Sequence, residues 1–287
     1  MNVVTADQAQ KLRELVGTKQ DIRVISVASG KGGVGKSSLS VNLAIALSRL
    51  GIRVLVIDAD FGLANVDIML GVVSRYNVSH FLQGERTFSE IIQFGHEGVR
   101  FVSGGSGMSD LLQMGEEQLE LLISGITSLD LPIDLIIIDT GAGINDKIVH
   151  MILSSTETIV VTTTEPTAIL DAYALVKTVT QQVQNHPIHV LINKCANADE
   201  ARRVMDGFVE FIGRHLGKNI NPLGVITFNH DVPLSIKRQI PILVSSPGCS
   251  TSREIERIAK AILDMPIEKQ ANNIFTRIFG RLRERGG

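Results

Sequence analysis

The stretch "SGKGGVGKSS" constrains the fold more than any other part of the chain. It fits the pattern G-x-x-x-x-G-K-[ST], with Gly30, Gly35, Lys36 and Ser37 at the fixed positions. The preceding run "IRVISVAS" is apolar and β-branched, and the run that begins at Lys36 has helical spacing. A strand, a glycine loop and a helix in this order form a phosphate-binding P-loop, because the amides at a helix N-terminus favour anions. The motif therefore predicts a nucleotide phosphate site.

Short apolar runs alternate with longer stretches of helical period along the chain. The predicted strands are 22–29, 53–58, 99–104, 135–139, 158–163, 188–193 and 223–228. The predicted helices include 36–50, 146–155, 168–184, 200–215 and 252–263. Nearly continuous apolar strands are typical of strands covered on both faces. We therefore expect an α/β fold, a mostly parallel twisted sheet with helices on both faces. It forms one domain, 21–265, with appendages at 1–20 and 266–287.

The composition limits the location and the partners of this domain. A formal net charge of −2 gives no overall basic footprint, so a nucleic-acid partner is not expected from charge. The two cysteines, Cys195 and Cys249, lie far apart and predict a reducing compartment rather than a disulfide framework. The opening residues have neither a basic nor an apolar run, and no segment approaches the roughly 20 apolar residues of a membrane span. The sequence predicts a cytoplasmic protein.

The P-loop residues have separate predicted roles. Lys36 is expected to reach the β- and γ-phosphates, and the Ser37 hydroxyl to bind Mg²⁺. The predicted nucleotide-binding residues of the loop are Gly30, Lys31, Gly32, Gly33, Val34, Gly35, Lys36, Ser37 and Ser38.

The loop holds a second lysine, Lys31, whose role the motif does not explain. Most surface lysines are simply solvated. Lys31, however, cannot readily fold onto its own nucleotide, because Lys36 already occupies that approach. It can reach a nucleotide in a facing subunit and place positive charge on the transferring phosphoryl group, as an arginine finger does.

These motifs together resemble one family. "KGGVGKS" resembles the deviant Walker A motif of the ParA/MinD ATPases, and "VLVIDADFGLANVD" resembles their second motif. "LIIIDTGAGI" resembles their Walker B and switch II, and "EPTAILDAYALVKTV" is similar to the branch of flagellar-number regulators called FlhG, FleN or YlxH. The resemblance implies a MinD-like P-loop fold, Mg²⁺-dependent ATP hydrolysis and an ATP-bound homodimer in which Lys31 contacts the facing nucleotide.

Three aspartates follow predicted strands. Asp58, Asp60 and Asp139 lie at carboxyl ends, which form the ligand-bearing rim of an open α/β sheet. Mg²⁺ at phosphates takes one or two carboxylates and retains waters, so we expect Asp139 to hold it through water and Asp58 to support that shell. The family resemblance implies that Asp60 positions the attacking water. Lys31, Lys36 and Asp60 are the predicted catalytic residues.

Two further features concern the nucleotide. Gly141 and Gly143 are predicted to let switch II approach the γ-phosphate and move after hydrolysis. "LINKCA" is similar to the guanine-reading N-K-x-D motif, but Ala196 stands where the aspartate would be. Without that carboxylate nothing there accepts the guanine N–H groups. The sequence therefore predicts ATP, with Asn193 as a base contact or, alternatively, only as the end of a strand.

The tail after Pro266 carries an amphipathic pattern. Its apolar stripe and its arginines are typical of an interfacial helix on anionic lipid, and MinD and FlhG-type proteins carry a membrane-targeting helix there. We expect reversible association with the inner face of the cytoplasmic membrane; packing on the parent sheet is the alternative. The predicted membrane residues are Ile274, Phe275, Ile278, Phe279 and Leu282.

The head "DQAQKLREL" matches an N-terminal element of many FlhG proteins, which activates the SRP-type GTPase FlhF. A short amphipathic helix suits docking into a partner groove, and the alternative is a cap on the protein's own surface. The predicted partner residues are Asp7, Gln8, Leu12 and Arg13. The resemblance also suggests flagellar C-ring proteins or a flagellar transcription regulator as partners, and no specific nucleic acid.

Two other functions remain open from the sequence. The first is a ParA-type DNA-segregation ATPase, which needs a basic surface; Arg202, Arg203, Arg214 and Lys218 are the candidates for one. The second is an electron-transfer ATPase like the nitrogenase iron protein. Cys195 and Cys249 do not sit in its cluster motifs, so we favour an ATP-dependent dimerising switch that regulates flagellar number or placement.

Overall fold

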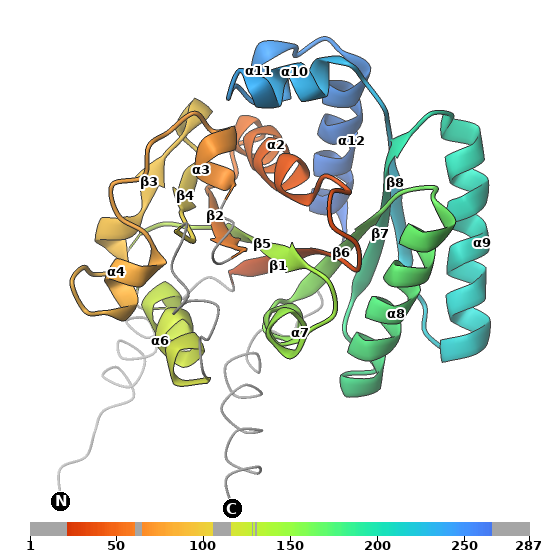
Figure 1. Ribbon diagram of the computed structural model, residues 1–287, viewed down its shortest axis with the longest axis horizontal. Coiled ribbons are helices and arrows are strands. Elements are labelled where there is room, and N and C mark those ends of the chain that lie inside the picture. The colour runs from red at the N-terminus through yellow and green to blue at the C-terminus, as the bar shows by residue number, and fades with distance from the viewer. Residues whose placement is uncertain (1–21, 61–64, 106–115, 128, 130, 266–287) are drawn as a thin grey trace, which may run out of the picture.

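The computed structural model describes residues 22–60, 65–105, 116–127, 129 and 131–265. The described residues form an eight-stranded sheet in the order β3-β4-β2-β5-β1-β6-β7-β8 (Figure 1). The strands are β1 (Arg23–Ser29), β2 (Val54–Ala59), β3 (Gln93–Phe94), β4 (Arg100–Val102), β5 (Leu135–Ala142), β6 (Glu157–Thr162), β7 (Ile188–Cys195) and β8 (Asn221–Thr227). Seven strands run parallel, and β3 pairs antiparallel with β4 at one edge.

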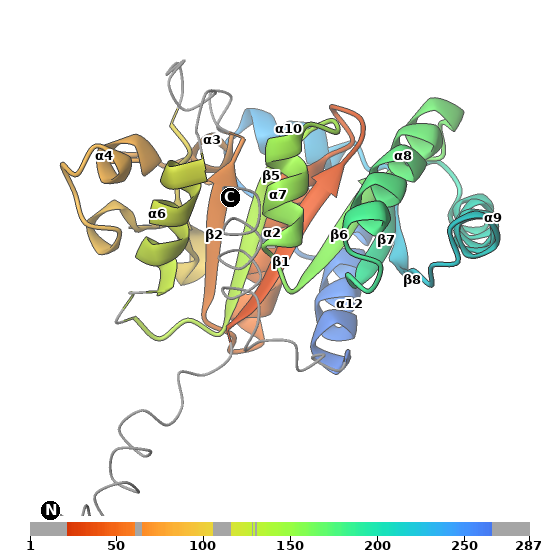
Figure 2. The same ribbon diagram turned by 90° about the horizontal axis from the view of Figure 1, so that it is seen from below.

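The helices lie on both faces of the sheet, as the sequence predicts (Figures 1 and 2). The α-helices are α2 (Lys36–Arg49), α3 (Val66–Met69), α4 (Val78–Leu82), α6 (Glu116–Thr127), α7 (Asp146–Leu153), α8 (Pro166–Gln182), α9 (Ala198–Leu216), α10 (Asp231–Lys237), α11 (Ile242–Ser245) and α12 (Ser250–Asp264). Two 3-10 helices, η1 (Ser89–Ile91) and η2 (His96–Gly98), flank β3.

Alternate residues of the central strands build the two layers of the core. Val54 and Val56 pack in one cluster with α2 and α12, whereas Leu55 and Ile57 face the opposite cluster with α4, α6 and α7. The residues of α8 and α9 pack with β6 and β7 on that second face. Because both faces are covered, each central strand is largely apolar, and its polar exceptions, such as Arg23, Asp58 and Asp139, are buried.

Local signals set the helix boundaries. α2 begins directly after Gly35, whose φ of 97° is left-handed and favours glycine. Pro166 opens α8, and Asn197 caps α9 by accepting from the amides of Asp199 and Glu200 at 2.9 and 3.0 Å. α9 ends at Leu216 and is followed by Gly217 at the C-cap, with φ 59°.

The topology positions the site. β1 lies between β5 and β6, while the next strand in the chain, β2, lies on the far side of β5. The carboxyl ends of β1, β2 and β5 therefore meet at one rim, where an open α/β sheet binds its ligands. No helix among the described residues has the length and apolar character needed to cross a bilayer.

Candidate nucleotide-binding site

The P-loop leaves β1 at Ser29 and enters α2 at Lys36. Gly33 and Gly35 have φ of 76° and 97°, where a side chain would be strained. A Cβ on Gly35 would also lie only 2.5 Å from Asn193 Nδ2. Gly33 is therefore favoured by its backbone conformation alone, and Gly35 by its backbone conformation and by close packing.

The end of β7 holds the second half of the loop. Asn193 Nδ2 donates to the Val34 carbonyl at 2.8 Å, and Lys194 Nζ donates to the Gly33 carbonyl at 2.7 Å. Asn193 Oδ1 in turn accepts from the Lys194 amide at 2.9 Å, with Lys194 in the left-handed region at φ 58°. The Asn193 side chain thus supports the loop backbone in this structure; its contact with a base stays a prediction.

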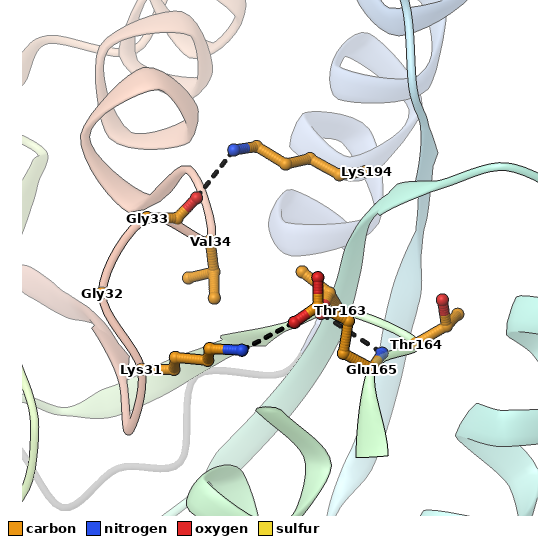
Figure 3. A pocket seen from close by; sticks show the side chains of 8 residues that line it. All are labelled: Lys31, Gly32, Gly33, Val34, Thr163, Thr164, Glu165 and Lys194. Atoms are coloured by element: carbon orange, nitrogen blue, oxygen red, sulfur yellow. Dashed lines mark hydrogen bonds and ion pairs between the residues drawn. The ribbon is translucent and has the colours of Figure 1, made fainter. Parts of the chain in front are cut away.

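The start of α8 contacts the first half of the loop (Figure 3). Lys31 Nζ forms an ion pair with Glu165 Oε2 at 2.6 Å and donates to Thr167 Oγ1 at 3.0 Å. A Cβ on Gly30 would lie 2.3 Å from the Asp171 carbonyl oxygen, so only glycine permits this approach. A pocket of about 250 Å³ lies between the loop, the end of β6 and Lys194.

Asp139, in β5, is fully buried beneath the P-loop. Its Oδ1 accepts from Ser40 Oγ at 2.9 Å. Its Oδ2 is buried and has no partner of hydrogen-bond geometry among the described residues, although the Ser37 hydroxyl is near enough to lower its pKa. Burial outweighs these hydroxyls and the Lys36 ammonium, and it raises the pKa of Asp139 to about 6. A buried carboxylate with an unused oxygen, beside a serine hydroxyl, fits a Mg²⁺ site.

Asp58 pairs in register with Asp139 on the neighbouring strand and is also fully buried. Its oxygens accept three backbone N–H groups, from Asp60 at 3.1 Å, Asn65 at 2.8 Å and Val66 at 3.0 Å. Burial and then the Asp139 charge raise the pKa of Asp58 to about 7, against the lowering effect of these amides. Asp58 therefore organises the start of α3 beside the site.

Asp60 is partly exposed and faces switch II. A Cβ on Gly141 would lie 3.2 Å from Asp60 Oδ1, so the glycine lets the Asp60 carboxylate lie close to the backbone of residue 141. Gly143 has φ 106°, and its amide donates to the Ser29 carbonyl at 3.0 Å. Desolvation raises the pKa of Asp60, while the Lys36 charge lowers it.

Lys36 is buried at the start of α2, between these acids. Burial lowers its pKa, and the charges of Asp139 and Asp60 oppose that shift. The structure thus brings a buried ammonium, two serine hydroxyls and three carboxylates to one helix N-terminus. This arrangement can bind the phosphates of a nucleotide together with a divalent cation.

Comparison with known proteins agrees with this geometry. A family model described as "ParA: NUBPL iron-transfer P-loop NTPase" matches residues 21–263. The chain belongs to the ParA/MinD family of P-loop ATPases. Among curated relatives, the antiactivator FleN of Pseudomonas aeruginosa is 32% identical over 88% of this chain and 90% of its own length. The flagellum site-determining protein YlxH of Helicobacter pylori is 31% identical over 88% and 89%.

Solved ParA/MinD structures share the fold. The cell division ATPase MinD of Pyrococcus furiosus superposes with a TM-score of 0.72 at 25% identity, covering 85% of this chain and 99% of that one. MinD of Pyrococcus horikoshii, solved with Mg-ADP, gives 0.71 at 24% identity, covering 88% and 98%. The predicted fold class is confirmed.

The structure adds residues to this ParA/MinD site that sequence reasoning missed. Ser40 lies one helical turn after Lys36, so its position on the helix was a signal that it faces the same way. Lys194 follows Asn193 in "LINKCA", but nothing in that motif indicated its bond to Gly33. Glu165 and Thr167 lie within the quoted "EPTAILD" motif, and only the fold brings them to Lys31.

The two terminal segments fall outside the described residues. The predicted partner residues (Asp7, Gln8, Leu12, Arg13) and the predicted membrane residues (Ile274, Phe275, Ile278, Phe279, Leu282) all lie there. Their roles stay predictions.

Proposed function

We propose that this protein is a Mg²⁺-dependent ATP hydrolase that dimerises in its ATP state and acts as a switch regulating flagellar number or placement. The observation that carries the proposal is the convergence of Lys36, Asp60 and Asp139 on the P-loop, from α2 and the ends of β2 and β5. ATP, rather than GTP, is proposed because Ala196 replaces the carboxylate that would read guanine.

The proposed chemistry assigns each group a task. The P-loop amides and Lys36 bind the β- and γ-phosphates, and Asp60 orients a water molecule for in-line attack on the γ-phosphorus. The new bond joins that water oxygen to phosphorus, the bond to the bridging oxygen breaks, and ADP and phosphate leave. Mg²⁺, held by Ser37 and Asp139 with Asp58 in support, would neutralise charge on the phosphate oxygens. Gly141 and Gly143 give switch II room to respond.

Lys31 makes the proposed switch depend on a second subunit. In the single chain its ammonium is held by Glu165 and Thr167, but the pair is exposed, with 37% of the Lys31 and 64% of the Glu165 side chain accessible. Exposed ion pairs are weak and screened by salt. Lys31 can therefore leave Glu165 at little cost when a facing nucleotide offers more negative charge.

The flagellar role is supported by the relatives. FleN is named an antiactivator and YlxH a flagellum site-determining protein, and each matches about nine tenths of this chain. We propose the GTPase FlhF as the partner of the head, with flagellar C-ring proteins or a transcription regulator as further partners. The tail of a single subunit is proposed to bind anionic membrane weakly. The dimer carries two tails and is proposed to bind more tightly.

Of the four candidate basic residues for the DNA-segregation alternative, Lys218 is buried, and Arg202, Arg203 and Arg214 are exposed. Arg202 and Arg214 form ion pairs with Asp199 and Glu210 on their own helix, and Lys218 is buried with its ammonium on the Gln184 carbonyl at 2.8 Å. A duplex needs accessible cations to displace its counterions. Lys218 does not supply that surface, whereas the three arginines are accessible on α9; salt-sensitive retention of the protein on DNA would favour this alternative.

The deciding experiment is size-exclusion chromatography of the Asp60→Ala variant with ATP and with ADP. We expect a stable dimer with ATP only, because water is no longer oriented for attack. Lys31→Ala should bind ATP, stay monomeric and fail to hydrolyse, whereas Lys36→Ala should not bind. Normal turnover by Asp60→Ala, or a normal dimer of Lys31→Ala, would contradict the proposal.

The tail is tested by sedimentation with anionic vesicles. The full chain with ATP should bind, and a truncation ending at residue 265 should not. Equal binding of the two proteins would remove the membrane role of the tail.

The head is tested by adding a peptide of residues 1–20 to FlhF. The peptide should stimulate GTP hydrolysis, and a Gln8→Ala peptide should not. An unchanged rate with the unmodified peptide would remove the activator role.

A further inference from the structure

Asp58 has an unusual set of contacts for a carboxylate next to a phosphate site. It is the penultimate residue of β2, it has no exposed surface, and its oxygens accept backbone N–H groups from both ends of one loop. Oδ1 accepts from the amide of Asp60, and Oδ2 accepts from the amides of Asn65 and Val66. One side chain thus connects the strand end to the first residue of α3.

A simple capping role does not account for this arrangement. Asn65 stands at the N-cap position of α3, and its side chain makes no capping hydrogen bond. A cap at a helix end is normally supplied by such a local side chain, which stays near solvent. Here the amides are satisfied by a fully buried carboxylate, whose desolvation is costly. This buried carboxylate lies beside Asp139 and two residues before Asp60 in the sequence.

We propose that Asp58 is a positioning residue for hydrolysis, which fixes the backbone of Asp60 and the start of α3 through these three N–H groups. The proposal rests on the proposed function, because it assigns to Asp58 the placement of the group that orients water. It also specifies how Asp58 supports the Mg²⁺ shell: through the backbone that surrounds it, and not by offering a free oxygen.

The geometry predicts which kinetic parameter changes. A carboxylate has about four lone-pair sites, and three of those of Asp58 are used by amides. Loss of these bonds should displace Asp60 while Ser37, Lys36 and Asp139 stay in place. Displacement of an orienting group by about 1 Å costs about 100-fold in rate. Turnover should therefore fall while ATP affinity and the Mg²⁺ requirement stay nearly unchanged.

Two substitutions grade the effect. Asp58→Asn keeps the shape and one acceptor oxygen, and Asp58→Ala removes both oxygens. We expect kcat to fall about 10-fold in the first and about 100-fold in the second, with ATP affinity and the Mg²⁺ concentration for half-maximal activity within about threefold of the parent. If Asp58→Ala does not fold, Asp58→Asn decides.

Two other aspartates are the matched controls. Asp139→Asn should raise the Mg²⁺ requirement. Asp67→Asn changes a carboxylate in the first turn of the same helix, where it accepts from the Ile68 amide at 2.8 Å and from Ser103 Oγ at 3.0 Å. Because Asp67 makes no bond to Asp60 in this structure, its variant should keep normal turnover.

Hydrogen exchange gives a readout that does not depend on turnover. In the Mg-ADP-bound full chain, NMR should show the amides of Asp60, Asn65 and Val66 exchanging at least about 10-fold faster in Asp58→Asn than in the parent or in Asp67→Asn. A nonspecific loss of stability would instead accelerate exchange throughout the core.

The outcomes separate this inference from the proposed function. Normal kcat and normal exchange in Asp58→Asn would overturn the inference, and so would a Mg²⁺ requirement raised as in Asp139→Asn with kcat restored by excess Mg²⁺. If Asp60→Ala itself hydrolyses ATP normally, the proposed function fails. If Asp60→Ala is inactive while Asp58→Asn is normal, only the inference fails.

Discussion

Buried charged residues lie at the amino-terminal ends and at the carboxyl-terminal ends of the strands of the same sheet. They are paired with opposite charges at the first and incompletely compensated at the second. At the amino-terminal edge, Glu157 of β6 is surrounded by partners. Arg23 donates to both of its oxygens, at 2.5 and 3.0 Å, and His189 contacts Oε2 at 2.8 Å. At the carboxyl-terminal rim, Asp58, Asp139 and Lys36 are buried with incomplete compensation.

The pKa shifts express this difference. Burial alone would raise the pKa of Glu157, but the hydrogen bonds from His189 and Arg23 outweigh it and hold the value at about 2. At the other edge burial prevails, so the pKa values of Asp58 and Asp139 rise to about 7 and 6. Charges that are fully paired tie strands together. Buried charges that no opposite charge fully compensates mark where a charged ligand belongs.

The largest expected effect comes from removing the negative charge of Glu157 at the amino-terminal ends of the strands. Glu157→Gln leaves the Arg23 guanidinium buried without its counter-charge, so the free energy of unfolding should fall by about 3–5 kcal/mol. Urea denaturation measures the loss. ATP affinity of the folded variant should stay within about twofold, because the P-loop lies at the opposite edge. A free energy of unfolding close to the parent's would mean that the ion pair of Arg23 and Glu157 does not stabilise this end of the sheet.

The next effect concerns the rim. Lys36→Ala removes the buried ammonium, and ATP affinity in a calorimetric titration should fall at least about 100-fold, or about 3 kcal/mol. Stability without nucleotide should not decrease appreciably, because the lysine is poorly compensated there. A large loss of stability would instead mean that Lys36, like Glu157, is well compensated in the folded protein. That result would contradict the difference between the two ends of the sheet.

A third prediction follows from the raised carboxyl pKa values. The folded protein binds protons at Asp58 and Asp139 more tightly than the unfolded chain does. The free energy of unfolding should therefore fall as pH rises from about 4 to 7, and then level off. Urea denaturation without nucleotide measures this slope. Asp58→Asn should flatten it, and an unchanged slope in that variant would exclude Asp58 as a source.

Glu157 adds the opposite dependence at lower pH. Its depressed pKa contributes stability above about pH 4.5 that is lost as pH falls towards 2. Stability without nucleotide should therefore peak where these two ranges meet, at about pH 4.

The smallest effect provides the matched control for Glu157→Gln. Glu165→Gln makes the same chemical change in an exposed ion pair with Lys31. Because solvent screens both groups, we expect no measurable change in the urea midpoint. A clear loss of stability would show that exposure does not separate the two pairs.

The sequence predicted which residues lie at the rim better than it predicted the hydrogen bonds and ion pairs between residues. The glycine pattern located the P-loop, and the rule that parallel strands meet at one rim placed Asp58 and Asp139 side by side. The partners of these groups were not predictable, because Arg23 and Glu157, or Lys31 and Glu165, are 134 positions apart and only the fold brings them together. The two-residue strand β3 was missed for a related reason: its identity depends on pairing with β4 and not on a pattern of its own.

One hydrogen bond at the amino-terminal ends of the strands has a practical consequence. Arg23 Nη1 also donates to the Ile262 carbonyl at 2.6 Å, so this side chain connects the start of β1 to the last turn of α12, and both lie toward the lower end of the molecule in Figure 2. A short flexible linker from residue 265 to residue 22 would close this body into a ring, which could be reopened at the exposed turn of Gly84 and Glu85. Such a circular permutant should fold, and it would offer new chain ends away from residues 22 and 265.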